Sequence, residues 1–330
     1  MTAFRYVVAP AMALLAVPAT ASAHQQLACG ATITKSTTLR ADLANCPGDG
    51  LVIGRDNITL DLGRRTIDGT GAGVGIKVTG RRGVRIVGGT VKEFGIGIGL
   101  DAARGNRVTG VTLTGHPVRG IDAANGSDDN VFEGLDATGN RNAITLNGSR
   151  GNVVRLSELS RNAITGIALI GAPHNRITAN RIADNGYNGA VVVEGSDENE
   201  IALNDIRGGE LGLIVDTAAH NVVTLNHVDG AADGILVAGD ANTVAANAVD
   251  GAKGGCEGCF GYGIGVLSGT GNVVKANLVT RSAADGIHAV AGTWIGFNIA
   301  LRNAGLGINA PGAIDGGGNR SERCAGVRCR

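Results

Sequence analysis

Short segments rich in branched apolar residues recur along most of this chain. Within them apolar residues alternate with polar or small ones, as in Gly212-Leu213-Ile214-Val215-Asp216. Period-two patterning with β-branched residues is typical of β-strands, because it places alternate side chains on opposite faces. The pattern therefore predicts many short strands separated by bends rich in Gly and Asn.

The strands recur at a nearly fixed interval. Each unit reads Asn, an apolar pair, a second Asn, a polar loop and Gly-Ile-x-Val. Its first position recurs every 21 to 30 residues, at Asn57, Gly83, Asn106, Asn130, Asn152, Asn175, Asn199, Asn221, Asn242, Asn272 and Ile295. Such periods belong to solenoids. A leucine-rich horseshoe would need a helical segment or a fixed leucine frame, so the sequence favours a β-helix of about eleven coils, each rising about 4.8 Å.

The Asn residues form two columns, which we interpret as structural. Asn tolerates the left-handed backbone of a sharp bend, and its amide can bond the same amide one coil away. The second column comprises Asn180, Asn204, Asn226, Asn247, Asn277 and Asn298.

One strand face of the coil is predicted to meet solvent. The Ile and Val of Gly-Ile-x-Val should point inward, which turns the residue between them outward. Coil by coil that residue is Gly99, Asp122, Thr145, Ala168, Val192, Ile214, Leu236, Gly265, His288 and Asn309. Two residues further on lie Asp101, Asn147, Ile170, Glu194, Asp216, Ala238, Leu267 and Val290. Three residues before the outward residue of each coil lie Arg119, Asn142, Thr165, Gly189, Leu211, Asp233, Tyr262, Asp285 and Leu306.

Polar side chains gather at two places on this face. The early group comprises Asp101, Arg119, Asp122, Asn142 and Asn147, and the late group comprises Asp233, Tyr262, Asp285 and His288. Between them runs a stripe of Ala168, Ile170, Val192, Ile214, Leu236 and Ala238. An exposed apolar stripe marks an interaction surface. Either the inserted residues Gly251–Gly261, which include Phe260, cover it, or a second copy does so in a homo-oligomer.

The late group is the candidate catalytic site. His288 can transfer a proton near neutral pH. Asp285 and Asp233 can orient its ring or hold Ca²⁺ through oxygen ligands. Tyr262 can stack on a sugar or act as an acid. The competing interpretation is that these are solvated residues on an exposed strand face.

The early group is the candidate substrate-binding surface, together with Glu194 and Asp216. Arg119 suits the carboxylate of a uronic acid. A surface ion pair with Asp101 or Asp122 explains it equally well.

Composition narrows the class of protein. The 330 residues include 55 Gly but one Trp, three Tyr and five Phe, and the 29 basic residues balance the 29 acidic ones. This balance predicts no nucleic-acid partner. Arg5, the apolar stretch from Val7 to Thr20 and Ala21-Ser22-Ala23 predict a signal peptide, so the protein is expected to be secreted or periplasmic. No later apolar run is long enough to span a membrane.

The six cysteines fall into three local pairs, Cys29 with Cys46, Cys256 with Cys259, and Cys324 with Cys329. Disulfides persist in exported proteins, so we predict that each local pair is bonded. A zinc site at Cys256 and Cys259 would need two more ligands close by, and a redox motif would need a βαβ unit.

The repeated Asn-x-Val-x-x-Asn-x-Ile and Gly-Ile-x-Val motifs resemble the pectin-lyase-like superfamily of β-helix proteins. More narrowly, they resemble the NosD-like group and its carbohydrate-binding and sugar-hydrolase relatives. The resemblance covers about Leu51 to Gly318. It implies an all-β, single-stranded right-handed parallel β-helix, capped at both ends.

The resulting domain division has four parts. They are a signal peptide (1–23), an N-terminal cap (24–50), the β-helix (51–312) and a C-terminal cap closed by a disulfide (313–330). A short helix between Cys29 and Cys46, with Leu39 and Leu43, is predicted for the first cap.

The resemblance also implies a polysaccharide, an acidic one being an option, as the partner along the strand face. An enzyme would be a polysaccharide lyase, a C5-epimerase or a glycoside hydrolase. The Asp-Pro-His motif of alginate epimerases and the Asn-Thr-Asp and Gly-His-Gly motifs of polygalacturonases do not occur. A non-catalytic envelope scaffold and a NosD-like metal-handling protein stay open, although both methionines, Met1 and Met12, lie in the predicted signal.

Overall fold

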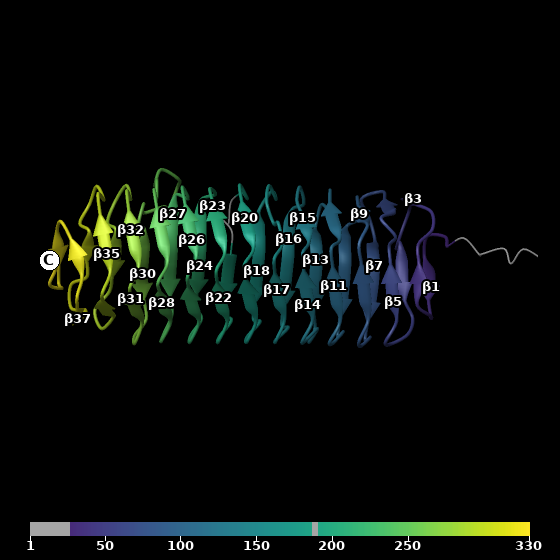
Figure 1. Ribbon diagram of the computed structural model, residues 1–330, viewed down its shortest axis with the longest axis horizontal. Coiled ribbons are helices and arrows are strands. Elements are labelled where there is room, and N and C mark those ends of the chain that lie inside the picture. The colour runs from purple at the N-terminus through teal and green to yellow at the C-terminus, as the bar shows by residue number, and fades with distance from the viewer. Residues whose placement is uncertain (1–26, 187–190) are drawn as a thin grey trace, which may run out of the picture.

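The computed structural model describes residues 27–186 and 191–330. The predicted signal peptide, with its cleavage site near Ala23, lies outside the described residues. Figure 1 shows a straight rod of stacked coils, with the N-terminal coils in purple at one end and the C-terminal coils in yellow at the other. Every regular element in the described ranges is a β-strand. Among these residues no helix is long and apolar enough to cross a membrane.

The first sheet runs the length of the rod and carries the predicted outward columns. Its fourteen strands are β1 (Ala31–Ile33), β4 (Leu51–Ile53), β7 (Val74–Thr79), β10 (Ile96–Asp101), β13 (Arg119–Ala124), β16 (Asn142–Asn147), β18 (Thr165–Ile170), β21 (Val191–Glu194), β24 (Leu211–Asp216), β27 (Asp233–Ala238), β30 (Ile264–Ser268), β33 (Ile287–Ala289), β36 (Ile308–Asn309) and β39 (Cys324–Ala325).

The second sheet follows the first around each coil. Its thirteen strands are β2 (Thr37–Thr38), β5 (Thr59–Asp61), β8 (Arg85–Val87), β11 (Arg107–Thr109), β14 (Val131–Glu133), β17 (Val153–Arg155), β19 (Arg176–Thr178), β22 (Glu200–Ala202), β25 (Val222–Thr224), β28 (Thr243–Ala245), β31 (Val273–Lys275), β34 (Trp294–Gly296) and β37 (Ile314–Gly317).

The third face consists of two shorter sheets, which bridges through Glu158 connect. One comprises β3 (Leu43–Cys46), β6 (Thr66–Gly69), β9 (Thr90–Lys92), β12 (Thr112–Thr114) and β15 (Asp136–Ala137). The other comprises β20 (Arg181–Ala183), β23 (Asp205–Arg207), β26 (His227–Asp229), β29 (Ala248–Asp250), β32 (Leu278–Thr280), β35 (Ile299–Leu301) and β38 (Arg320–Ser321).

A narrow apolar core fills the rod. The inward positions predicted from Gly-Ile-x-Val are confirmed, since Ile121, Ile144, Ile235 and Ile287 are fully buried. All strand pairs are parallel, and each strand pairs with its equivalent one coil away, as in the pair of β13 with β16. The predicted all-β parallel β-helix is therefore confirmed.

The Asn columns form ladders of amides inside the bends. In the first ladder the backbone N–H and side-chain Nδ2 of Asn130 donate to Asn152 Oδ1, at 2.9 and 3.1 Å. In the second ladder Asn204 donates to Asn226 Oδ1 in the same way, at 3.0 and 2.9 Å. The predicted bonding of amides between coils is confirmed, and it satisfies backbone groups that the sharp bends leave unpaired.

The left-handed backbone expected for the Asn columns occurs at one of their members, Asn57 (φ 56°), and the expectation was wrong for the others. From Asn106 onward the left-handed backbone lies one residue before the Asn, for example at His220 (φ 58°) before Asn221 and at Leu225 (φ 57°) before Asn226. The ladder therefore selects Asn for its inward-pointing amide. The left-handed position of the bend is occupied by the residue before it.

The repeat frame is also displaced at its two ends. Val84, and not Gly83, aligns with Asn106, since the Val84 N–H donates to Asn106 Oδ1 at 2.9 Å. At the other end Val273 pairs with Trp294, so Thr293, and not Ile295, follows Asn272.

Both predicted caps, as far as they are described, continue the coil, which gives about twelve turns where about eleven were predicted. The predicted helix between Cys29 and Cys46 was wrong, because β1 pairs with β4 and β3 pairs with β6. Leu39 and Leu43 are buried in the core of the coil. Because the coil already places these apolar side chains in the core, a helix is not needed to bury them.

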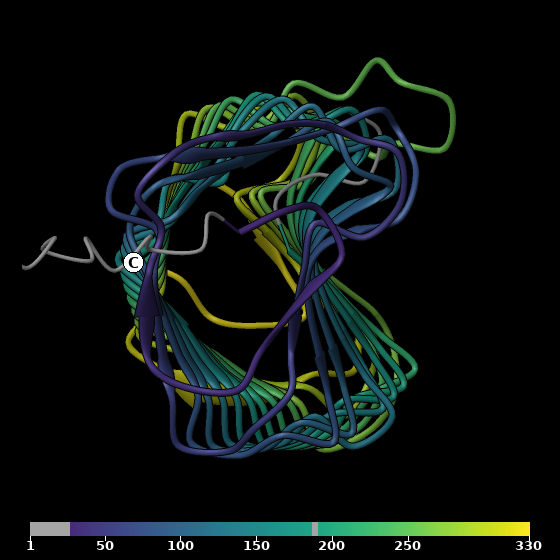
Figure 2. The same ribbon diagram turned by 90° about the vertical axis from the view of Figure 1, so that its right-hand side faces the viewer.

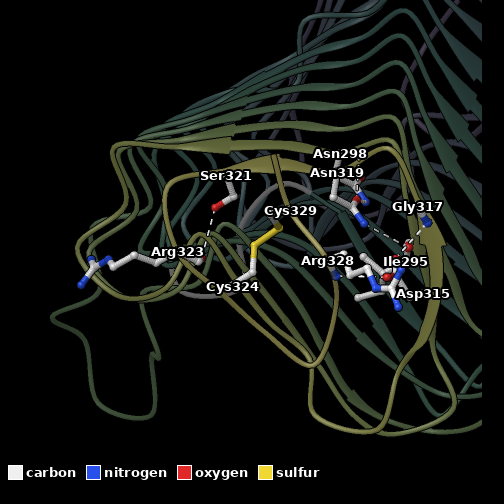
Figure 3. The surroundings of a disulfide bond; sticks show 10 residues. All are labelled: Ile295, Asn298, Asp315, Gly317, Asn319, Ser321, Arg323, Cys324, Arg328 and Cys329. Atoms are coloured by element: carbon white, nitrogen blue, oxygen red, sulfur yellow. Dashed lines mark hydrogen bonds between the residues drawn. A yellow bond between two sulfur atoms is a disulfide. The ribbon is translucent and has the colours of Figure 1, made fainter.

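Disulfides join all three predicted cysteine pairs. Figure 3 shows the last of them, Cys324–Cys329, in the closing segment of the rod. The second Asn ladder ends beside it, where Asn298 Nδ2 donates to Asn319 Oδ1 at 3.2 Å.

Candidate functional site

The first sheet aligns the predicted outward residues in one column. Strand registers place Asp122 beside Gly99, Thr145 beside Asp122, and His288 between Gly265 and Asn309. The next column shifts by one residue at a bulge, where Ala238 pairs with Ser268 and not with Leu267. Gly189 and its neighbours lie outside the described residues.

Asp233 begins β27 and is completely buried. Its Oδ1 accepts the backbone N–H groups of Gly261 and Tyr262, at 2.7 and 3.0 Å, and its Oδ2 accepts that of Phe260 at 3.1 Å. The carboxylate therefore fixes the end of the inserted loop. It lies behind the exposed surface.

Tyr262 follows the inserted loop and covers Gly265 on β30. A Cβ at Gly265 would lie 3.1 Å from Tyr262 Cδ2 and 2.8 Å from Leu236 Cδ2, so the absent side chain makes room for the phenol ring. The Tyr262 ring stacks on His288, with centroids 4.5 Å apart, and on Phe260, with centroids 5.2 Å apart. Phe260 is 49% exposed, which leaves ring surface of this stack in contact with solvent.

Asp285 and His288 form the polar side of the same cluster. His288 Nδ1 lies 3.3 Å from Asp285 Oδ2, which also accepts Asn309 Nδ2 at 2.9 Å. Asp285 Oδ1 accepts the backbone N–H of Leu306 at 2.8 Å. This carboxylate favours a proton on His288 Nδ1 and leaves Nε2 without a partner among the described residues.

Burial is the main cause that raises the pKa of the Tyr262 hydroxyl, and the negative charges of Asp285 and Asp233 add to it. The phenol consequently stays protonated at neutral pH and can donate a hydrogen bond. We call Phe260, Tyr262, Asp285, His288 and Asn309 the late site.

The early group is arranged differently. Arg119 Nη1 lies 3.0 Å from Asp122 Oδ2, so the guanidinium is already paired. Asp101 accepts Asn125 Nδ2 at 2.7 Å. Arg119 Nε and Asp122 Oδ1 are buried without a hydrogen-bond partner in the described structure.

The other predicted substrate-binding residues lie on β16, next to the strand of Arg119 and Asp122, and on later coils. Asn142 Nδ2 contacts the carbonyl of Val118 at 3.5 Å, and Asn147 is exposed at the end of β16. Glu194 and Asp216 are neighbours on β21 and β24. No aromatic ring stacks near them within the described residues.

One end of the apolar stripe is buried beside Tyr262, the residue that directly follows the insertion. Figure 2 shows the loop of residues 251–261, in green, projecting from the rod. Leu236 is buried beside Tyr262, whereas Ile170 at the other end of the stripe is 39% exposed.

Two members of the late site were not predicted as site residues. Phe260 was considered only as a cover, and Asn309 only as a position in the outward column. The signal for Asn309 was its register beside His288, and the signal for Phe260 was its place two residues before Tyr262.

The described residues contain no group of three or more His, Cys, Asp or Glu side chains that could hold a metal ion. Both Asp285 oxygens accept hydrogen bonds, and Asp233 is occupied by three backbone N–H groups. The arrangement does not fit the Ca²⁺ site considered for these two carboxylates.

Residues 29–210, more than half of the chain, match the family model described as periplasmic copper-binding protein (NosD). Comparison with curated proteins finds no match.

Several solved structures are similar to this chain. A mutant of the periplasmic alginate epimerase AlgG matches with a TM-score of 0.57 and 12% identity, over 89% of this chain and 78% of that one. The A-module of mannuronan C-5 epimerase AlgE6 from Azotobacter vinelandii matches with a TM-score of 0.49 and 12% identity, over 91% of each chain. DFA-IIIase from Arthrobacter chlorophenolicus matches with a TM-score of 0.47 and 16% identity, over 73% of this chain and 60% of that one. The likeness to AlgG shows a shared parallel β-helix fold.

Proposed function

The chain belongs to the NosD family, and from that premise we propose that it binds a polysaccharide outside the cytosol, with the late site as the contact. Three disulfides support an oxidising compartment. Many folds of one type serve different functions, so the residues of the site carry this proposal.

One observation carries it: the half-exposed Phe260 ring stands beside a stacked phenol, an imidazole, a carboxylate and an amide. An aromatic ring offers an apolar surface to the C–H face of a sugar, while polar groups beside it bond the hydroxyls. A solvated strand face would not need a buried Asp233 to hold the aromatic loop in place.

We infer a neutral glycan. Asp285 carries a carboxylate, and in the described structure no Lys or Arg side chain forms a hydrogen bond or an ion pair with the five residues of the late site. A uronate at this position would meet a like charge. Arg119, the residue that suits a uronate, is paired with Asp122 in the early group.

Copper handling does not fit the side chains present. All six cysteines are in disulfides and do not offer thiolates. Methionine occurs only at positions 1 and 12. Copper sites use soft sulfur ligands and clustered imidazoles. Residues 27–186 and 191–330 contain no such cluster of ligands.

A second function, proton transfer to a bound sugar, is favoured by one observation. Asp285 orients His288 so that Nε2 is left for a substrate, and Tyr262 supplies a protonated hydroxyl close by. This is the arrangement of a base and an acid in one site. Without turnover, the same residues make a binding module or an envelope scaffold.

The test is retention of the mature chain on immobilised neutral and acidic polysaccharides, with reducing ends and ultraviolet-absorbing unsaturated products followed in parallel. Phe260→Ala should weaken retention on a neutral glycan about 10-fold, because it removes the exposed ring. The matched control is Ile170→Ala, an exposed apolar residue on the same sheet, which should retain full binding. Equal binding by both variants, or retention on acidic glycans alone, would contradict the proposal.

A further inference from the structure

A second exposed surface lies on another face of the rod, at the corner between the second and third sheets in the last coils. It consists of Leu278, Trp294, Phe297, Ile299 and Ile314, which we call the corner patch. Phe297 is 60%, Ile314 56% and Leu278 45% exposed. Trp294 pairs with Ile314, and Leu278 pairs with Ile299, so the patch is continuous across neighbouring coils.

Glycines hold the two aromatic rings of the patch in place. A Cβ at Gly316 would lie 2.1 Å from the Trp294 ring, and a Cβ at Gly318 would lie 2.5 Å from the Phe297 ring. The two rings lie 6.4 Å apart. Each ring therefore rests on the backbone of the next coil, in space that a side chain would otherwise fill.

Phe297 occupies a costly backbone position. Its φ is 60°, and the same left-handed bend has glycine in the first coils, as at Gly110 and Gly134, and leucine or alanine in the later ones, as at Leu225 and Ala276, so that Phe297 is its one aromatic residue among the described residues. A bulky residue in the left-handed region is a rare choice. An exposed phenyl ring at such a bend contributes little to the core, which points to an interaction outside the molecule.

Unpaired cations border the patch. Arg320 pairs in register with Ile299, and Lys275 ends β31 just before the bend of its coil. Both side chains are exposed and have no ion-pair partner within the described residues. Some cations of the earlier coils are neutralised, as in Arg155 with Glu133 at 2.9 Å and Arg181 with Glu158 at 2.8 Å. The carboxylate nearest the patch, Asp315, accepts the backbone N–H groups of Gly317 and Arg328.

We propose that the corner patch docks this protein on an anionic lipid surface. Aromatic and aliphatic side chains bordered by free cations are the combination that enters a lipid headgroup layer, where negative charge complements Lys275 and Arg320. A second copy of the chain on a two-fold axis would bring these cations toward their own equivalents. A glycan would find a single hydrogen-bonding side-chain group among the five patch residues, the Trp294 indole N–H.

The experiment uses the mature chain with vesicles of phosphatidylcholine, alone or mixed with phosphatidylglycerol. Trp294 is the only tryptophan of the chain, so its fluorescence reports directly on the patch. We expect a blue shift and co-sedimentation with the anionic vesicles alone, weakened by salt. Phe297→Gly should reduce binding about 10-fold, and Lys275→Gln with Arg320→Gln should abolish the preference for phosphatidylglycerol.

The matched control is Leu156→Gly. Leu156 has the same bend conformation (φ 54°) and is 61% exposed, but its neighbours are ion-paired. Glycine relieves the backbone at both positions, so both variants should stay folded. Absence of binding to anionic vesicles, or equal binding by the two glycine variants, would overturn the proposal. The proposal would also be overturned if Phe297→Gly abolished binding to a glycan, or abolished a dimer, while binding to the vesicles persisted.

Discussion

Arg119 and Asp122 in the early coils occupy the same two positions of the coil as Asp285 and His288 in the late coils. The frames read Arg119-Gly120-Ile121-Asp122 and Asp285-Gly286-Ile287-His288. Side-chain exposure spans a similar range in both pairs, at 31% for Arg119 and 17% for Asp122, and at 15% for Asp285 and 28% for His288. Position and burial therefore do not distinguish the two regions.

The preceding coil makes the difference. Ile96 and Gly99 precede the early pair, whereas Tyr262 and Gly265 precede the late pair. Over Gly99 the nearest atoms belong to the aliphatic Val74 and Ile96 side chains, and over Gly265 they include the Tyr262 ring. Arg119 and Asp122 form an ion pair with each other. His288 of the late pair also stacks on Tyr262, which stacks in turn on the half-exposed Phe260.

The largest effect on stability should come from the anchor that only the late region has. Asp233→Ala leaves three backbone N–H groups without their acceptor, and we expect a loss of about 3 kcal/mol in the free energy of unfolding. Asp233→Asn keeps one acceptor oxygen and should lose less. Removal of the partly buried early ion pair by Asp122→Ala, which leaves no backbone group unpaired, should cost about 1 kcal/mol. Denaturant unfolding measures all three, and equal losses would erase the distinction between the two regions.

A pair of glycine substitutions tests the room made for Tyr262. Gly265→Ala places a Cβ against Leu236 and Tyr262, whereas in Gly99→Ala the closest atom is Val74 Cγ1 at 3.1 Å. We expect the first to cost about 1.5 kcal/mol and to displace the phenol from His288, and the second to be tolerated. Unfolding curves together with glycan retention report both effects. Full retention by Gly265→Ala would show that the stack is not needed.

The smallest effect concerns ionisation. Because the pKa of Tyr262 is raised in the folded state, the unfolded phenol ionises first, so stability should fall as the pH rises above about 10. Asp285→Asn should lower that pKa toward its ordinary value, and Asp122→Asn should leave it unchanged. Titration of the phenolate absorbance at about 295 nm measures the pKa of Tyr262 in each variant. Identical titrations would contradict the influence of the Asp285 charge on the pKa of Tyr262.

The repeat made most of the fold predictable. Alternation and the Asn columns are local signals repeated in every coil, so the inward Ile and Val residues followed directly. The register of the outward column followed too, but its exposure did not, because Thr145 and Leu236 are buried. The ends were predicted less well, because Leu39 and Leu43 lie in a segment where the repeat is faint.

The late site was predictable only as a set of positions. The register brought Asp285 and His288 to one column, but the burial of Asp233 depends on the loop that returns over it. Phe260 carries no repeat signal, since the insertion occurs once in the chain. Side chains that an irregular loop places are set by tertiary contacts, which periodicity does not encode.

The most direct test compares two double variants on the neutral polysaccharide that retains the parent chain. The account predicts that Asp285→Ala with His288→Ala reduces retention at least about 10-fold, as the loss of several hydrogen bonds to one ligand should. Arg119→Ala with Asp122→Ala should retain the parent's affinity. The reverse result, with binding lost in the early variant and kept in the late one, would contradict the assignment of function to the late coils.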